Sequence, residues 1–395
     1  MAPFELLIDG KNLAGDLTLD VINPATEEVF ASCARASEAQ LDQAVAAAQA
    51  AFPTWSAIPI ERRRAILEEV ADVVVAHAEE IGRILTQEQG KPLEEAIAEV
   101  YGFAVFTRAF AAMDLPVDVL EETDARRVEA HRIPLGVVGA IVPWNFPIVL
   151  LAFKFGPALM AGNTIVIKPA PTTPLSTLRL AALIKDVVPA GVVNVIVDAN
   201  ELGAKMTAHP GIRKISFTGS TATGARVMAG AADTLKRITL ELGGNDAGIV
   251  LGDVDPKQVA PKLFQGAFGN CGQTCIAIKR LYVHERIYDA VCDELAAIAA
   301  STSIGDGFDE KTTLGPLQNK AQYEKVKALL VEAASQGRII AGGGVPARPG
   351  YFIEPTIVRD IAEGTRLVDE EQFGPVLPIL KFSDPDAAIG FLKGI

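Results

Sequence analysis

Apolar positions in the first part of the chain recur at helical spacing. Residues 37–51 and 60–85 carry them three and four positions apart, which is the spacing of one face of an amphipathic helix. The pattern therefore predicts a helical region from the start of the chain to about residue 113. Residues 116–132 are charged and have no such stripe, which predicts a hairpin that leaves the main body.

From Gly136 onwards, short apolar runs alternate with segments of helix length. The runs lie at residues 137–142, 164–167, 192–197, 214–217 and 237–240. This alternation is typical of a parallel sheet with helices on both faces, and such sheets bind ligands at the carboxyl ends of their strands. Beyond Leu242 strands and helices mix again, which predicts a second α/β domain.

Composition narrows the partners of this fold. The chain has 395 residues and a formal net charge of −13, so a nucleic acid or an anionic membrane is not expected as its main partner. Four cysteines are too few for a disulfide framework, and the N-terminus has no basic segment followed by an apolar one. We therefore expect a cytoplasmic protein. No metal site is expected, because none of the histidines pairs with a cysteine or carboxylate at ligand spacing; they are His77, His131, His209 and His284.

Three loops at expected strand ends carry polar groups. Residues 217–224 place Gly219, Ser220 and Gly224 at the start of a helix, where backbone N–H groups suit a pyrophosphate, although for such a loop alone a helix N-cap is the commoner explanation. Asn145 lies between two prolines and could donate to an oxyanion or simply form a turn. Lys168 ends a strand, where it could meet a cofactor or only solvent.

Two further positions suggest covalent chemistry. Glu241 follows an apolar strand, and burial there would raise its pKa towards that of a general base, whereas an exposed strand-end glutamate would have no such role. Cys271 and Cys275 lie in a glycine-rich turn, and nothing in that turn alone says which of them would be a nucleophile rather than a buried apolar side chain.

Taken together and in order, these motifs resemble the aldehyde dehydrogenase superfamily over nearly the whole chain. The motifs are PWNFP, KPA, FTGST, ELGG, FxNxGQxC and EEQFGPV. The resemblance implies an α/β fold with a Rossmann-like parallel-sheet cofactor domain at residues 1–115 and 133–240. It also implies an oligomerisation hairpin at residues 116–132 and an α/β catalytic domain at residues 241–395, so a homo-oligomer is expected.

The resemblance also assigns the site. It makes Cys275 the nucleophile, Glu241 the general base and Asn145 the oxyanion donor, acting on an aldehyde with NAD or NADP as cofactor. The positions it places against the dinucleotide are Val142, Pro143, Trp144, Lys168, Gly219, Ser220, Gly224, Leu242, Glu371 and Phe373. A coenzyme-A-dependent acylating enzyme is disfavoured by Glu241, because acylating relatives generally lack that base.

Two departures from the family pattern change the expectations. Pro171 stands where NAD-preferring members commonly have a glutamate, so both cofactors are expected, with less than about tenfold discrimination. The chain ends at Ile395, several dozen residues before family members do, so the alternative expectation is a cofactor-binding fragment with weak or no catalysis.

The apolar side chains of the helix expected after Asn145 predict the class of substrate. In the resemblance this helix lines the aldehyde tunnel, and its side chains here are Ile148, Val149, Leu150, Phe153 and Phe155. Apolar burial favours medium-chain aliphatic or aromatic aldehydes over short or carboxylated ones. The alternative is that these residues simply form part of the core.

Overall fold

The computed structural model describes residues 3–392 and divides them into two compact units. Unit 1 covers residues 3–21, 29–85 and 94–242, and unit 2 covers residues 22–28, 86–93 and 243–392. Two short N-terminal segments, 22–28 and 86–93, therefore belong to the second unit and not to the first.

Unit 1 is built on a seven-stranded sheet with the order β11-β10-β7-β8-β9-β1-β2. The five strands from β11 to β9 are parallel, and β1 and β2 extend the sheet in antiparallel fashion. Their bounds are β1 Leu6–Ile8, β2 Lys11–Leu13, β7 Val137–Ile141, β8 Thr164–Lys168, β9 Val193–Val195, β10 Ile212–Thr218 and β11 Arg237–Glu241. Every residue of β7 and β8 is buried, as expected for strands covered on both faces.

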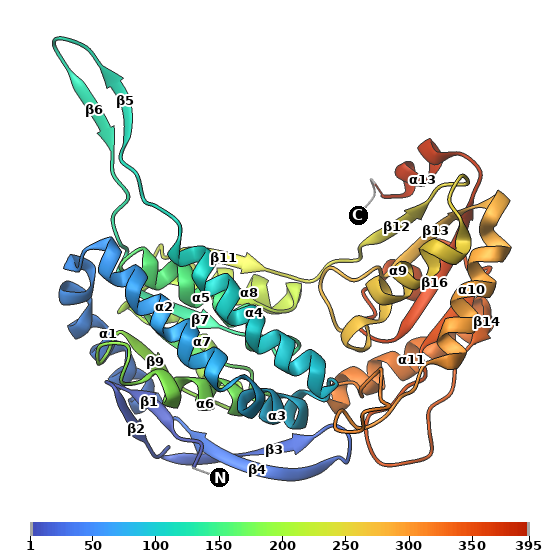
Figure 1. The fold of residues 1–395 in the computed structure, drawn as a ribbon, viewed down its shortest axis with the longest axis horizontal. Helices are drawn as coiled ribbons and strands as arrows, with labels where there is room; N and C mark the ends of the chain where they lie inside the picture. Colours follow the sequence, from blue (N-terminus) through green and yellow to red (C-terminus); the bar gives the residue numbers. More distant parts are fainter. Residues whose placement is uncertain (1–2, 393–395) are drawn as a thin grey trace. The chain divides into compact units, whose positions relative to one another are not determined.

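Helices cover both faces of this sheet (Figure 1). Helices α5 and α6 pack on it with α2 behind them, and α1, α7 and α8 pack together on the other face. The bounds are α1 Glu38–Ala57, α2 Ile60–Ala76, α3 Ala78–Gln89, α4 Leu93–Ala111, α5 Val149–Met160, α6 Leu175–Ile184, α7 Leu202–Ala208 and α8 Thr221–Ala232.

The order of strands in unit 1 reverses next to β7. The chain adds β8 and β9 on one side of β7, then returns to place β10 and β11 on its other side. In open parallel sheets, ligands bind outside the carboxyl ends of the strands at such a reversal. The loops after β7 and β10 are therefore the first place to look for a cofactor site.

The prediction of helix at the start of the chain is wrong for residues before 37. Besides β1 and β2, this segment forms the two-stranded sheet of β3 (Leu17–Asn23) and β4 (Glu28–Arg35). Leucine, leucine and valine alternate with other residues from Leu17 to Val21, which is the period of a strand. The longer helical stripes that follow obscured this short alternation.

The charged stretch at residues 116–132 forms a hairpin, as expected. Strand β5 (Asp118–Glu122) pairs antiparallel with β6 (Arg127–Ala130). Figure 1 shows the hairpin extending away from the sheet of its own unit.

Unit 2 contains a five-stranded sheet with the order β12-β13-β16-β15-β14, in which only β14 is antiparallel to its neighbour. Alternate side chains of β13 face opposite layers: Leu281 and Val283 pack with α9 and α10, and Tyr282 packs with α11. The strands are β12 Ala247–Val250, β13 Arg280–His284, β14 Arg338–Ala341, β15 Thr356–Arg359 and β16 Val376–Phe382. The α-helices are α9 Pro256–Phe268, α10 Tyr288–Ser301, α11 Lys320–Gln336, α12 Arg366–Asp369 and α13 Pro385–Leu392, and the 3₁₀ turns are η1 Gly269–Gly272 and η2 Glu285–Ile287.

Within the described residues, we find no helix with the length and apolar character needed to span a bilayer.

Candidate active site

The carboxyl edge of the unit 1 sheet collects the polar residues predicted from the strand ends. Asn145 follows β7, Lys168 ends β8 and Glu241 ends β11. Between them, Gly219 and Ser220 follow β10, whose last residue is level with Glu241 in the strand pairing. The prediction that these groups share one edge of one sheet is therefore confirmed.

The loop from β10 into α8 has the features of a phosphate-binding turn. Ser220 caps the helix, accepting a hydrogen bond from the Thr223 N–H at 3.3 Å, and the Gly219 N–H donates to the Glu241 carbonyl at 3.0 Å. The first N–H groups of a helix have no partner within the helix and carry a partial positive charge. A pyrophosphate fits this chemistry, with Ser220 and the start of α8 as the groups that would hold it.

Gly224 has a packing role in this turn. A Cβ at this position would lie 2.5 Å from the Leu242 side chain, so only glycine lets α8 approach the end of β11 this closely. Tight packing of helix against strand is a known use of glycine in dinucleotide-binding folds. Gly224 and Leu242, both predicted from the family pattern, thus contact each other.

The loop after β7 is fixed to the neighbouring strand. The Val142 N–H donates to the Lys168 carbonyl at 3.0 Å, and the side chains of Val142 and Asn145 are buried while Pro143 and Trp144 are half-buried. This backbone bond places residues predicted to contact the dinucleotide next to the end of β8.

Glu241 does not have the burial that its sequence context suggested. It is exposed at the end of β11, so the desolvation expected for a general base there is not present. The reason is the place of β11 at the edge of the sheet, where none of its five residues is buried.

Lys154 is a buried cation close to this edge that the sequence reasoning missed. It lies on α5, and its Nζ donates to Thr218 Oγ1 at 2.7 Å and to Ser216 Oγ at 3.3 Å. Burial lowers the pKa of Lys154 to about 8, and the negative charge of Glu241 opposes this shift. A lone lysine inside a strongly apolar helix was the available signal, because lysines are almost never fully buried without a partner.

The cysteine turn belongs to unit 2 and has an unusual backbone. Asn270, Cys271 and Gly272 have φ angles of 53°, 59° and 71°, three left-handed residues in a row. For residues other than glycine this conformation is costly and persists only where the surroundings impose it.

Buried amide side chains impose this conformation. Gln273 is fully buried; its Nε2 donates to the Asn270 carbonyl at 3.0 Å, and its Oε1 accepts from the Gln318 N–H at 2.8 Å. Gln89 Nε2 donates to Asn270 Oδ1 at 3.1 Å. The turn is thus held by hydrogen bonds inside unit 2 instead of by a regular element.

The two cysteines of the turn differ in accessibility. Cys271 is buried and belongs to the apolar core of unit 2, whereas Cys275 is half-buried. A substrate can reach only a thiol that is at least partly exposed. Of the two thiols, Cys275, the one that the family resemblance implied, is therefore the one that a substrate could reach.

Lys279 links the Cys275 loop to Glu371. Its buried ammonium donates to the carbonyls of Thr274 at 2.7 Å and Cys275 at 3.0 Å, and lies 3.7 Å from Glu371 Oε1. Burial lowers the pKa of Lys279, and the charge of Glu371 opposes this. Phe373, a predicted cofactor contact, has its ring centroid 6.0 Å from the same ammonium.

Glu371 is fixed from a second side. Its Oε1 accepts from the Gly244 N–H at 3.2 Å, and a Cβ on Gly243 would come within 2.3 Å of its Oε2. In the ELGG motif, Gly243 therefore makes room for this carboxylate and the Gly244 N–H binds it. Of the residues predicted to form the site, unit 2 holds Cys275, Glu371 and Phe373, and unit 1 holds the others.

The residues predicted to line the substrate tunnel differ in their burial. Ile148 and Phe155 are in the core of unit 1, so the expectation that they line a substrate path is wrong. Phe153 is 44% exposed, and its ring lies 4.5 Å from that of Phe106 and 6.0 Å from that of Phe110, measured between centroids. These three phenylalanines, here called the aromatic cluster, form an accessible apolar surface of unit 1.

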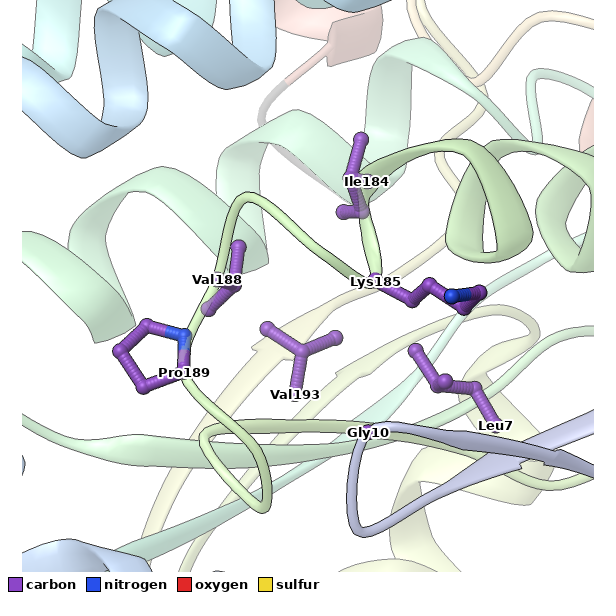
Figure 2. A pocket seen from close by; sticks show the side chains of 7 residues that line it. All are labelled: Leu7, Gly10, Ile184, Lys185, Val188, Pro189 and Val193. Atoms are coloured by element: carbon purple, nitrogen blue, oxygen red, sulfur yellow. The ribbon is translucent and has the colours of Figure 1, made fainter.

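A small apolar pocket of unit 1 lies away from this edge. Figure 2 shows its lining residues, Leu7, Gly10, Ile184, Lys185, Val188, Pro189 and Val193. Val193 is the first residue of β9, so the pocket lies at the amino ends of the parallel strands and not at the carboxyl ends. Across residues 3–392, no three histidine, cysteine or acidic side chains are grouped so that they could hold a metal ion.

Comparison with known proteins gives a family match over residues 13–392, to a family described as "Aldehyde dehydrogenase family". A probable aldehyde dehydrogenase from Pseudomonas sp is 42% identical over 388 residues, which are 98% of this chain and 79% of that protein. The NADP(+) succinate-semialdehyde dehydrogenase of Escherichia coli is 38% identical over 372 residues, which are 93% of this chain and 77% of that protein. The NAD+ complex of an aldehyde dehydrogenase from Bacillus cereus superposes with a TM-score of 0.95 at 35% identity. The superposition covers 98% of this chain and 81% of that one.

These matches extend over all the motifs on which the resemblance was based. They confirm the expected α/β fold class, the expected enzyme class, an NAD(P)-dependent aldehyde dehydrogenase, and NAD or NADP as the cofactor. The chain belongs to the aldehyde dehydrogenase family.

Proposed function

We propose that the chain oxidises an aldehyde to a carboxylic acid through a covalent intermediate on Cys275. The Cys275 thiolate attacks the aldehyde carbon, and Asn145 and the Cys275 N–H donate to the resulting oxyanion. When bound, the nicotinamide accepts the hydride that leaves this carbon. A thioester on Cys275 remains, and water activated by Glu241 then displaces the thiol and releases the acid. In total, aldehyde, water and NAD(P)+ give acid, NAD(P)H and a proton.

The contact between Lys279 and the Cys275 loop carries this proposal. One buried ammonium binds the carbonyl of Cys275 and lies beside Glu371, which the family pattern places against the cofactor. The backbone of Cys275 is thereby linked, within unit 2, to a carboxylate that the family resemblance assigns to the cofactor site. A structural cysteine has no need of such a relation.

Turnover measurements test the proposal directly. We expect acid and NADH or NADPH to form in equal amounts from propanal and NAD+ or NADP+, with no requirement for coenzyme A. Acyl-coenzyme A as the product would instead indicate the acylating reaction. Cofactor binding without turnover would support the alternative of a weakly active cofactor-binding fragment.

For the substrate, we propose aldehydes with an apolar tail. The aromatic cluster presents accessible rings on α4 and α5, and α5 begins four residues after Asn145. Removing a methylene from water contributes about 0.8 kcal/mol, so KM should fall from acetaldehyde to hexanal and benzaldehyde. A semialdehyde is the second candidate, because the Escherichia coli relative is named for succinic semialdehyde. A lower KM for succinic semialdehyde than for hexanal would favour it.

We also propose that the hairpin of β5 and β6 binds another copy of the chain. Its exposed apolar residues include Leu120, which is 68% exposed, and its strand edges are short and charged. Light scattering of the full chain and of Leu120→Asp should show a smaller species for the variant. Because the reaction needs Cys275 as a thiol, a reducing compartment, the cytoplasm, is the proposed location.

A further inference from the structure

A buried ion pair joins the carboxyl ends of β8 and β9. Lys168 Nζ lies 2.6 Å from Asp198 Oδ1, and the two side chains are 5% and 0% exposed. The strands are parallel, with Ile167 level with Val195, so Lys168 is level with residue 196 and Asp198 lies just beyond it. Asp198 is therefore at the same edge as the predicted cofactor ligands, and no motif had pointed to it.

The pair is fixed from the side of α7 as well. The other carboxylate oxygen, Asp198 Oδ2, accepts from the Leu202 N–H at 2.8 Å. The next residue, Gly203, lies over the lysine, since a Cβ there would be 3.7 Å from Lys168 Cε. With both carboxylate oxygens in use, Asp198 holds the ammonium of Lys168 in place.

Two further cations near this edge also have acidic partners. Arg35 donates to Glu201 at 2.8 Å through Nε, and Lys205 Nζ lies 3.2 Å from Glu38. NADP differs from NAD by a 2′-phosphate, a dianion that needs cationic partners when it is bound. At this edge Lys168, Arg35 and Lys205 are all neutralised by carboxylates.

We infer that Asp198 makes this chain select NAD over NADP, because its carboxylate neutralises Lys168 and repels a 2′-phosphate. This inference rests on the proposed function, in which Lys168 contacts the dinucleotide. It replaces the sequence expectation of weak discrimination, which rested on the presence of Lys168 and on Pro171. The acid absent from position 171 is supplied from the adjacent strand end.

Cofactor binding by the full chain, measured without substrate, tests the inference. Titrations with NADH and NADPH, followed by energy transfer from tryptophan to the nicotinamide, give both dissociation constants. We expect the wild-type chain to bind NADH at least about tenfold more tightly, which corresponds to about 1.4 kcal/mol. This measurement needs no variant and therefore does not depend on whether a substituted protein folds.

Asp198→Asn identifies the residue responsible. Its single side-chain oxygen can accept from the Leu202 N–H, which leaves Lys168 available to a phosphate. We expect the dissociation constant of NADPH to fall at least about fivefold. The ratio of the NADPH dissociation constant to that of NADH should fall by the same factor. The matched control is Asp186→Asn, which removes the carboxylate of an exposed pair of the same length, Lys185 Nζ to Asp186 Oδ2 at 2.6 Å. The control should leave the ratio unchanged.

The outcomes separate the inference from the proposed function. Equal affinity of the wild-type chain for both cofactors, or an unchanged ratio in Asp198→Asn, would overturn the inference and leave the proposed function standing. If neither NADH nor NADPH bound the wild-type chain, the proposed function would fail and the inference with it.

Discussion

Two regions supply the candidate active-site residues, and they hold them in different ways. The carboxyl edge of the unit 1 sheet presents Asn145, Lys168 and Glu241 at the ends of regular strands, of which β7 and β8 are buried throughout. The Cys275 turn of unit 2 instead uses consecutive left-handed residues held by buried amides. Strand ends position a side chain through a ladder that tolerates many sequences. A strained turn depends on a few specific hydrogen bonds, so substitution of its supporting residues should be costly.

The largest expected effect is at the thiol. Cys275→Ala should lower kcat for aldehyde oxidation by a factor on the order of 10⁴, because the covalent route is lost. NADH binding should be preserved. Cys271→Ala is the matched control, since it removes a buried thiol from the same turn, and it should keep most of the activity. Equal losses in steady-state assays of the two variants would show that the wrong thiol had been assigned.

The second-largest expected effect on activity is at Glu241, at the carboxyl edge of the unit 1 sheet. Glu241→Gln should lower steady-state turnover by about 10²-fold or more while leaving the first hydride transfer intact, because only the hydrolytic step needs the base. Stopped-flow absorbance should show a burst of NADH followed by very slow turnover. A variant without a burst would mean that Glu241 acts before the thioester forms.

Gln273→Ala tests how strongly the Cys275 turn depends on its buried amides. The variant leaves the buried Gln318 N–H without its acceptor, so the free energy of unfolding should fall by about 1–3 kcal/mol. Urea unfolding measures this change, with Gln258→Ala as the control, an exposed glutamine whose Nε2 donates to Asp255 Oδ2 at 3.0 Å. A loss no greater than that of the control would contradict the view that buried amides hold the turn.

The smallest expected effect is a pH dependence of stability caused by Lys154. Burial lowers the pKa of Lys154 to about 8 in the folded chain, while the unfolded chain keeps the ordinary value near 10.5. Between these values the unfolded state binds more protons, so the free energy of unfolding should rise with pH, by at most about 1 kcal/mol per pH unit. Lys154→Met should remove this rise. Parallel slopes for wild type and variant from pH 8 to 10 would contradict it.

Sequence reasoning found the residues that lie at the ends of long apolar runs. Asn145, Lys168 and Glu241 follow such runs, and parallel strands end at one edge, so their shared location could be predicted. The exposure of Glu241 could not, because it follows from the place of β11 at the edge of the sheet, where none of its residues is buried. The early strands were missed because the strand-period alternation from Leu17 to Val21 is short and is followed by much longer helical stripes.

The partners of the site residues were harder to predict than the residues themselves. Lys154, Asp198 and Lys279 act through contacts with segments 30 or more positions away, such as Lys168 with Asp198 and Lys279 with Glu371. Periodicity says that a position is buried but not which charge it meets. A single buried lysine in an apolar segment is the one local sign of such a contact, and it names no partner.

The covalent intermediate is the central claim, and mass spectrometry of Glu241→Gln tests it most directly. The variant is mixed with benzaldehyde and NAD+, quenched in acid, digested and sequenced. The proposal predicts a benzoyl group on Cys275 that forms only when both aldehyde and cofactor are present. A benzoyl group on Cys271, or none on Cys275 after the NADH burst, would contradict it.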